Sequence, residues 1–236
     1  RPGDAARALA PRHQVFVWDM PGYGHSAKHE GQDVSLAAQG RVFAELLAHW
    51  GLERPAVFAH DFGGCVALRA HLLHGARYER LALVDPVALA PWGSPAYRLL
   101  GDRAEVFGQL PPALHAALVR EYIRSASHHG LHPAVLDRLV APWLGEAGQS
   151  AFYRQIEQNG QRWTDEIEGL YGQVEPPVLI CWGTADTWIP VDRAQRLAGL
   201  IPGSRVRLVE RAGHLVQEDA PAELTAALLG FLHEAG

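Results

Sequence analysis

Short apolar runs alternate along the chain with longer stretches in which apolar residues recur every three or four positions. Short runs that end at a glycine, a proline or a polar residue predict buried strands. We expect strands at Val15–Trp18, Ala56–Ala59, Leu81–Val84, Val178–Cys181 and Val206–Val209. The longer periodic stretches predict helices at Ser35–Trp50 and Gly63–His74, between the first three strands. Strands that alternate with helices in this way favour a parallel sheet with right-handed crossovers.

The middle of the chain lacks this alternation. Between residues 91 and 172 the pattern predicts helices alone, at Pro112–Ser125, Pro133–Val140 and Gly148–Gln158. Beyond it, a helix at Val191–Leu200 separates the last two strands, and a closing helix begins at Pro221. The sequence therefore predicts an α/β core built from residues 1–90 and 173–236, with residues 91–172 inserted over the sheet as a helical lid.

Composition narrows the class of partner. The 236 residues carry 21 Lys and Arg against 26 Asp and Glu, a net charge of −5, which argues against nucleic acid as a partner. No apolar run reaches the roughly 18 residues of a membrane span, and the first residues lack the apolar stretch of a secretory signal. We expect a cytoplasmic protein without a membrane partner. Its two cysteines, Cys65 and Cys181, fit buried thiols better than a disulfide framework.

A sharp turn is predicted between the second strand and its helix, at the segment Ala59–Gly64 (AHDFGG). Such a turn presents the side chain of its central residue at the edge of the sheet, and it needs small neighbours. Ala59 and Gly63, two positions before and after Asp61, meet that need. Asp61 is therefore a candidate nucleophile. The structural alternative is that Asp61 only caps the helix through its side-chain oxygen.

Two further candidates follow the last two strands. Asp186 comes shortly after Val178–Cys181, and His214 shortly after Val206–Val209. The carboxyl ends of parallel strands meet at one edge of a sheet, so both side chains are expected near Asp61. The order of nucleophile, acid and histidine along the chain is one of the known orders of a catalytic triad.

Four motifs carry a family resemblance: D-x-P-G-x-G-x-S at Asp19–Ser26, H-D-x-G-G at His60–Gly64, W-G-x-x-D-x-x-x-P at Trp182–Pro190, and a G-H motif at Gly213–Pro221. They resemble the α/β-hydrolase superfamily, and Asp61 resembles the nucleophile of its epoxide hydrolases and its haloalkane or haloacetate dehalogenases. The resemblance implies an α/β-hydrolase fold, a mostly parallel sheet flanked by helices with a lid. The glycines of the first motif also match a dinucleotide-binding loop, but a polar loop follows them where that fold needs a helix.

An aspartate nucleophile favours alkyl chemistry. A carboxylate that attacks an epoxide or a carbon–halogen bond forms an ordinary ester, whereas attack on an acyl group would form an anhydride, which disfavours an esterase. His214 would activate the water that hydrolyses the ester, and Asp186 would orient His214. The backbone N–H of Phe62 would stabilise the oxyanion. The small-molecule substrate is expected to be an epoxide, with a haloalkane or haloacid as the alternative.

The leaving group separates these two reactions. The lid segment Ala151–Asn159 is similar to the epoxide-hydrolase segment that presents a ring-opening tyrosine, which implies this role for Tyr153. Other tyrosines, left unranked, are Tyr97, Tyr122 and Tyr171. Dehalogenases hold the halide with tryptophan N–H groups, commonly one that follows the nucleophile, where this chain has Phe62. Trp92 and Trp143 of the lid, and Trp163 further along the chain, leave a different halide arrangement open.

The resemblance also predicts parts that this chain lacks. Three strands would precede Val15–Trp18, and the third, which would lie between Val15–Trp18 and Ala56–Ala59, would be followed by an H-G-x-P loop with a second oxyanion N–H. Either the sequence begins late, or the sheet closes up and half of the oxyanion hole is lost. A truncated, weak or non-catalytic protein is therefore a further alternative. No cofactor or metal is implied, and a monomer and a homodimer are both open.

Overall fold

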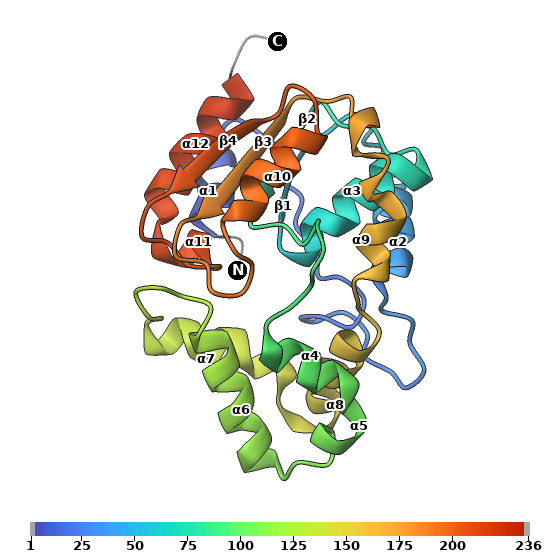
Figure 1. Cartoon of the computed structure of the whole chain (residues 1–236), viewed down its shortest axis with the longest axis vertical. Helices are drawn as coiled ribbons and strands as arrows, with labels where there is room; N and C mark the ends of the chain where they lie inside the picture. Colours follow the sequence, from blue (N-terminus) through green and yellow to red (C-terminus); the bar gives the residue numbers. More distant parts are fainter. Residues whose placement is uncertain (1–2, 234–236) are drawn as a thin grey trace.

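The computed structural model describes residues 3–233, so Arg1, Pro2 and the last three residues lie outside the description. Four parallel strands form one sheet in the order β1-β2-β3-β4 (Figure 1). Their bounds are β1 (Ala56–His60), β2 (Arg80–Val84), β3 (Val178–Gly183) and β4 (Arg205–Val209). β2 and β3 are buried along their whole length, as expected of central parallel strands. Four of the five predicted strands are thereby confirmed.

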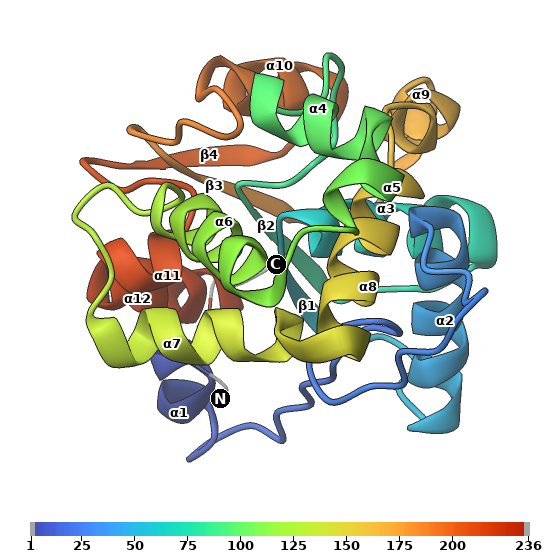
Figure 2. The same ribbon diagram turned by 90° about the horizontal axis from the view of Figure 1, so that it is seen from below.

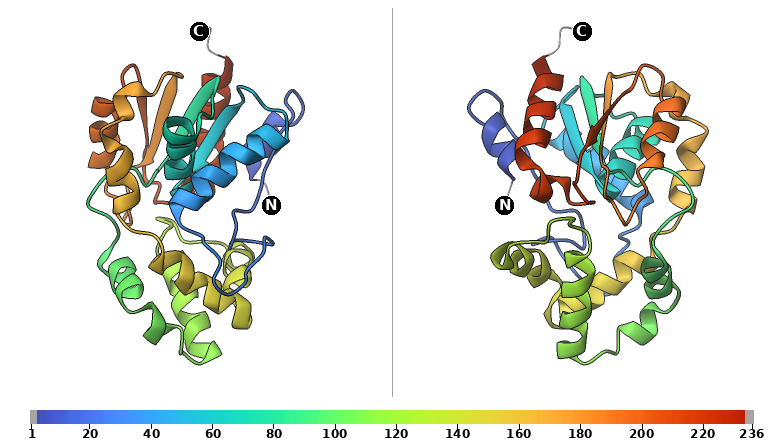
Figure 3. Two further views of the ribbon diagram at one scale, coloured as in Figure 1. Left: turned by 90° about the vertical axis from the view of Figure 1, so that its right-hand side faces the viewer. Right: turned by 60° about the vertical axis from the view of Figure 1, so that its left-hand side comes forward.

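Helices cover both faces of the sheet (Figure 3). On one face lie α2 (Leu36–His49), α3 (Phe62–His74) and α10 (Asp192–Leu200), which share an apolar cluster with the strands. On the other lie α1 (Asp4–Leu9), α11 (Val216–Asp219) and α12 (Pro221–His233). The Ser35 hydroxyl accepts the Ala38 N–H at 3.3 Å, which fixes the start of α2 where the sequence predicts it.

The middle of the chain is helical, as predicted. Its elements are α4 (Pro95–Asp102), α5 (Ala104–Phe107), α6 (Pro112–Arg124), α7 (Pro133–Val140), the 3₁₀ turn Ala141–Trp143, α8 (Gly145–Glu157), α9 (Arg162–Glu168) and the 3₁₀ turn Tyr171–Gln173. Helices α4 to α8 lie together beyond the carboxyl ends of the strands and have an apolar cluster of their own (Figures 1 and 2).

The end of this middle region returns to the core. Helix α9 packs against α3, and its Ile167 belongs to the main apolar cluster. A salt bridge of 2.8 Å joins Arg69 of α3 to Glu166 of α9. Within residues 3–233, no helix has both the length and the apolar character of a membrane span.

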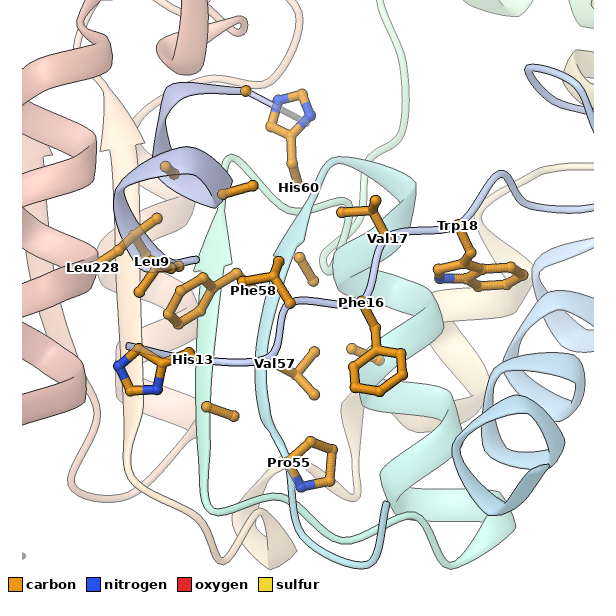
Figure 4. Close-up of a pocket in the computed structure, with 18 of the residues that line it drawn as sticks. Leu9, His13, Phe16, Val17, Trp18, Pro55, Val57, Phe58, His60 and Leu228 are labelled. Atoms are coloured by element: carbon orange, nitrogen blue, oxygen red, sulfur yellow. The ribbon is translucent and has the colours of Figure 1, made fainter. Parts of the chain in front are cut away.

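The predicted strand at Val15–Trp18 is wrong. This segment forms no ladder, and Val17 is 59% exposed. A cavity of about 770 Å³ lies between the segment and β1, lined by apolar side chains such as Phe16, Val57 and Phe58 (Figure 4). β1 pairs with β2 and with no other strand of the described chain, so the sheet has not closed up over the gap. An apolar run becomes a strand only when a neighbouring strand takes up its hydrogen bonds, and no strand within residues 3–233 pairs with this one.

Candidate active site

Asp61 lies on a strained turn between β1 and α3. Its φ of 51° and ψ of −123° place a non-glycine residue in a sparsely populated region of backbone space. The turn is held by hydrogen bonds from the Asp61 N–H to the Val84 carbonyl (3.2 Å) and from the Val87 N–H to the Asp61 carbonyl (3.0 Å). The Asp61 side chain makes no capping bond to α3, and it is 31% exposed. The capping alternative therefore finds no support, and the carboxylate is open to a ligand.

Close packing behind the turn depends on Gly64. A Cβ there would lie 2.4 Å from the Pro86 Cβ, whereas a Cβ on Gly63 would meet only the Ala59 Cβ, at 3.9 Å. The need for a small residue is thus greater at Gly64 than at Gly63, the position that the sequence argument singled out. The reason is that α3 packs against the loop after β2, where Pro86 lies.

His214 joins the two carboxylates. Its Nε2 lies 3.3 Å from Asp61 Oδ1, and its Nδ1 lies 2.9 Å from Asp186 Oδ2. The other oxygen of Asp186 accepts the backbone N–H groups of Trp188 (2.7 Å) and Ile189 (3.0 Å). Asp186 is therefore fixed from both sides, and it holds one ring nitrogen of His214 while the other faces Asp61. The structure thus brings the three predicted residues together, with His214 between Asp61 and Asp186.

A glycine allows the histidine loop to approach β3. A Cβ on Gly183 would lie 2.4 Å from the carbonyl oxygens of both Ala212 and Gly213, a distance that no side chain tolerates. The last residue of β3 must therefore be glycine for His214 to reach Asp186. This close approach explains why the W-G-x-x-D motif needs its glycine.

Comparison with known proteins identifies the family. Residues 2–221 match the model of the alpha/beta hydrolase fold family. This chain is an α/β hydrolase by family. It is 46% identical to an alpha/beta hydrolase fold protein from Burkholderia ambifaria, with a TM-score of 0.91 over 97% of this chain and 87% of that chain. It is 28% identical to epoxide hydrolase A of Mycobacterium tuberculosis, over 93% of this chain and 82% of that protein.

A third similarity is to an uncharacterized protein of Mycobacterium tuberculosis, which is 30% identical over 95% of this chain and 69% of that protein. A meta-cleavage product hydrolase is 20% identical with a TM-score of 0.78, a level that shows the shared fold. The predicted fold is thereby confirmed, and so is membership of a family of hydrolases.

Charge in this α/β hydrolase is divided between Asp61 and His214. Burial by itself would raise the pKa of Asp61, but the hydrogen bond and charge of His214 and the N–H of Phe62 hold it below its ordinary value. Burial by itself would lower the pKa of His214, but its hydrogen bonds to Asp186 and Asp61 raise it well above its ordinary value. The resting site therefore pairs an ionised Asp61 with an imidazolium.

His60 holds His214 in place through a hydrogen bond to its backbone. Its Nε2 donates to the His214 carbonyl at 2.8 Å, and the two rings lie 4.8 Å apart. Burial, followed by the charge of His214, lowers the pKa of His60 to about 4, so His60 stays neutral. On the other side Trp188 stacks on His214 at 5.0 Å. Sequence reasoning assigned neither residue a role, although both lie inside the quoted motifs.

Asp219 ties the histidine loop to the middle region. Its carboxylate accepts the N–H of Gly213 (2.7 Å), the hydroxyl of Ser127 (2.5 Å) and the N–H of His128 (2.7 Å). Burial works against this charge, but the four hydrogen bonds, which include a longer one from His129, keep the pKa of Asp219 below its ordinary value. The acidic position of the G-H motif is thus a structural anchor.

Tyr153 lies away from the triad. Its hydroxyl is 3.0 Å from Nδ1 of the buried His115, whose Nε2 lies 2.9 Å from the Trp143 carbonyl. Because Nε2 must donate to that carbonyl, Nδ1 is the acceptor and Tyr153 donates to it. Tyr153 lies on α8, as a lid residue would, and its ring packs within the helices of the middle region. It does not face Asp61.

Three other tyrosines lie close enough to Asp61 for its charge to act on them. Burial raises the pKa of Tyr23, Tyr97 and Tyr122, and the nearby negative charge of Asp61 raises each further. Tyr23 donates to Gln155 at 3.0 Å and Tyr97 to the Asn159 carbonyl at 3.0 Å. The Tyr122 hydroxyl has no hydrogen-bond partner among residues 3–233. Tyr171, the other unranked candidate, donates to the Ala88 carbonyl at 2.6 Å.

The predicted halide-binding groups differ in availability. The Trp92 indole donates to the Thr164 hydroxyl at 2.7 Å, so its N–H is already used. Trp143 packs edge-on against Tyr23 at 5.3 Å, and its indole N–H has no partner among the described residues. Phe62 is buried against Trp92, and its N–H is the one backbone donor that lowers the pKa of Asp61.

One cluster of potential metal ligands occurs among the described residues, and it overlaps the triad. Ligand atoms of Asp85, Asp186 and His214 lie within 4.8 Å of one another. Backbone N–H groups point at both carboxylates, from Gly183 to Asp85 and from Trp188 and Ile189 to Asp186. Such dipoles stabilise negative charge and disfavour a cation, so the cluster fits proton chemistry better than metal binding.

Proposed function

We propose that this α/β hydrolase opens epoxides through a covalent alkyl ester on Asp61. The observation that carries the proposal is a carboxylate, where a serine would support acyl chemistry, on a strained turn 3.3 Å from a histidine that a second aspartate holds. The similarity to an epoxide hydrolase over 93% of the chain supports the same reaction.

In the first step a carboxylate oxygen of Asp61 attacks an epoxide carbon. The ring C–O bond breaks, its electron pair stays on the oxygen, and Tyr122 supplies the proton. We assign this role to Tyr122 because its hydroxyl is near Asp61 and has no other partner, whereas the hydroxyl of Tyr153 is bound to His115. Tyr122 also packs on Trp188 at 4.4 Å, which in turn stacks on His214.

In the second step water hydrolyses the ester. Once Asp61 is esterified its negative charge is gone, so the pKa of His214 falls. The imidazolium proton then restores the Tyr122 phenol, and the neutral imidazole becomes a base. His214 then takes a proton from water, the hydroxide attacks the Asp61 carboxyl carbon, and the oxyanion accepts the Phe62 N–H. Asp186 stabilises the imidazolium that forms. In the collapse the bond between the carboxyl carbon and the alkyl oxygen breaks, and the leaving oxygen takes the proton from His214 to give the diol. The carboxyl proton of Asp61 then passes to His214, which restores the carboxylate and the imidazolium.

Dehalogenation is a second candidate, and the free indole N–H of Trp143 favours it. A halide leaves with its electron pair and needs donors rather than a proton, so Tyr122 would be dispensable. The two reactions share Asp61, His214 and Asp186. They differ in the mass that the substrate adds to the enzyme.

Intact-mass spectrometry of a His214→Phe variant tests the proposal. Without its base the cycle stops at the ester. After incubation with a panel of epoxides, we expect a gain equal to one whole epoxide, mapped to the peptide that contains Asp61. A haloalkane panel run in parallel would instead give the mass of the haloalkane less one hydrogen halide.

The matched control is the double variant Asp61→Ala/His214→Phe, which must show no adduct. A mass gain that survives Asp61→Ala would contradict the proposed nucleophile. Adducts from haloalkanes alone would move the assignment to dehalogenation. A folded variant without adducts in either panel would favour a weak or non-catalytic protein.

A further inference from the structure

Asp85 is a buried carboxyl that the proposed cycle does not use. It follows β2 directly, as Asp61 follows β1, and its side chain is completely buried. Its φ of 40° is one of three positive values among the described non-glycine residues, and another belongs to Asp61. Strain of this kind persists only where surrounding contacts hold the residue in place.

Both ends of Asp85 are fixed by β3. Its N–H donates to the Cys181 carbonyl at 3.0 Å, and its Oδ1 accepts the Gly183 N–H at 2.9 Å. Its Oδ2 is buried and accepts no hydrogen bond from the protein. The Asp85 carboxyl belongs to a cluster with Asp186 and His214, in which one ligand atom of each residue lies within 4.8 Å of the others.

The charges around Asp85 determine whether its buried carboxyl is ionised or neutral. The titratable groups around Asp85 are Asp186 on the loop after β3, His214 on the loop after β4, and the Cys181 thiol of β3, which burial keeps neutral by raising its pKa to about 12. The one positive charge here, on His214, is already paired with Asp61 and Asp186. A second buried carboxylate beside Asp186 would have no counter-charge.

We propose that Asp85 is a positioning residue that carries a proton: its neutral carboxyl donates a hydrogen bond through Oδ2 to Asp186 and holds that acid against His214. The pair then has one negative charge, matched by the imidazolium. Burial raises the pKa of Asp85 and the neighbouring Asp186 raises it further, while His214 and the Gly183 N–H oppose the shift without reversing it. The proton itself does not depend on the proposed function, whereas its effect on turnover does.

Infrared spectroscopy detects the proton without any substrate. We compare the wild type with Asp85→Asn at neutral pH, with aspartate carboxyls labelled with ¹³C. The expected difference is the loss of a carboxylic-acid C=O band that shifts in D₂O. Loss of carboxylate bands alone would overturn the proposal. This result stands whether or not the protein acts on epoxides, so its failure is distinct from failure of the proposed function.

Two variants test the effect on the reaction. Asn keeps a neutral donor next to Asp186, whereas Asp85→Leu removes it. We expect kcat of Asp85→Leu to be about tenfold below that of Asp85→Asn, the effect of losing one hydrogen bond to a buried carboxylate. The acidic limb of the pH profile should move by less than about half a unit in Asp85→Asn, because no charge is removed.

An ionised Asp85 predicts the opposite. Both substitutions would then remove the same negative charge, lower the pKa of His214 and move the acidic limb equally. Equal shifts in Asp85→Asn and Asp85→Leu would overturn the proposal. Thermal unfolding checks that both variants fold, and the infrared comparison on Asp85→Asn remains decisive should the leucine variant fail to fold.

Discussion

The two sides of the sheet differ in completeness. On one side β2, β3 and β4 pair along their length, and the loops that follow β3 and β4 hold Asp186 and His214 within hydrogen-bond distance of each other. On the other side the outer edge of β1 faces a cavity of about 770 Å³, and Val15–Trp18 runs past it without pairing (Figure 4).

The two sides of the sheet contribute to different steps of the proposed reaction. In the proposed mechanism, Asp61, His214 and Asp186 all follow paired strands. The proposed oxyanion donor, the Phe62 N–H, lies next to the open side, whose cavity reaches His60 and Gly63. Attack by Asp61 needs no oxyanion hole, but hydrolysis of the ester does.

The largest expected effect concerns Asp61, the proposed nucleophile. Asp61→Ala should lower kcat/KM on the best epoxide by on the order of 10⁴-fold or more, since no covalent intermediate can form. Steady-state kinetics with thermal unfolding as a folding control measure this loss. Residual turnover within tenfold of the wild type would remove Asp61 from the mechanism.

Two tyrosines sharpen the assignment of the proton donor. Tyr122→Phe should lower kcat on epoxides by on the order of 10²-fold, because the ring oxygen loses its acid. Tyr153→Phe removes a hydrogen bond to His115 and should cost about 1 kcal/mol of stability, with a smaller effect on kcat. Kinetics and thermal unfolding of both variants decide between them, and the reverse ranking of the two kcat values would restore Tyr153 as the donor.

Stability should differ between the sides as well. Leu83 of β2 is completely buried, and Leu83→Ala should lower the free energy of unfolding by about 3 kcal/mol. Val17 is 59% exposed beside the cavity, and Val17→Ala should change it by about 0.5 kcal/mol or less. Urea denaturation measures both values, and comparable losses would mean that the open side is packed in solution.

The last predicted effect depends on pH. Asp219→Asn should cost about 2 kcal/mol, because hydrogen bonds to a carboxylate are replaced by weaker ones to an amide. Since the pKa of Asp219 is lowered in the folded state, its contribution is present above its ordinary pKa and is lost as pH falls through the folded value. Melting temperatures of both proteins should therefore converge as the solution is acidified, and a constant difference would count against the ionic anchor.

Much of the fold could be predicted from local pattern. The strands β1 to β4 are apolar runs between turn residues, and Ser35 and Pro221 mark the first turns of α2 and α12. Val15–Trp18 has the same pattern but no neighbouring strand, and pairing is a property of the tertiary structure that a local pattern does not contain. The pattern also did not predict α1, which packs against α12.

The candidate site divides in the same way. Asp61, Asp186 and His214 could be predicted because each follows a strand of a parallel sheet, and strand ends are set by the chain order. Tyr153 could not be placed, because the direction of a side chain on α8 depends on how several helices pack. Asp85 was missed although it follows β2 as Asp61 follows β1, because its role depends on its distance to Asp186 and His214.

The most direct test of the central claim follows oxygen through one turnover of the wild type. With enzyme in excess over epoxide in H₂¹⁸O, water attacks the Asp61 carboxyl carbon, and the diol leaves with an oxygen that came from Asp61. The account predicts ¹⁸O in the peptide that contains Asp61 and unlabelled diol. Label in the diol with none in that peptide would show direct attack of water on the substrate and would contradict the ester.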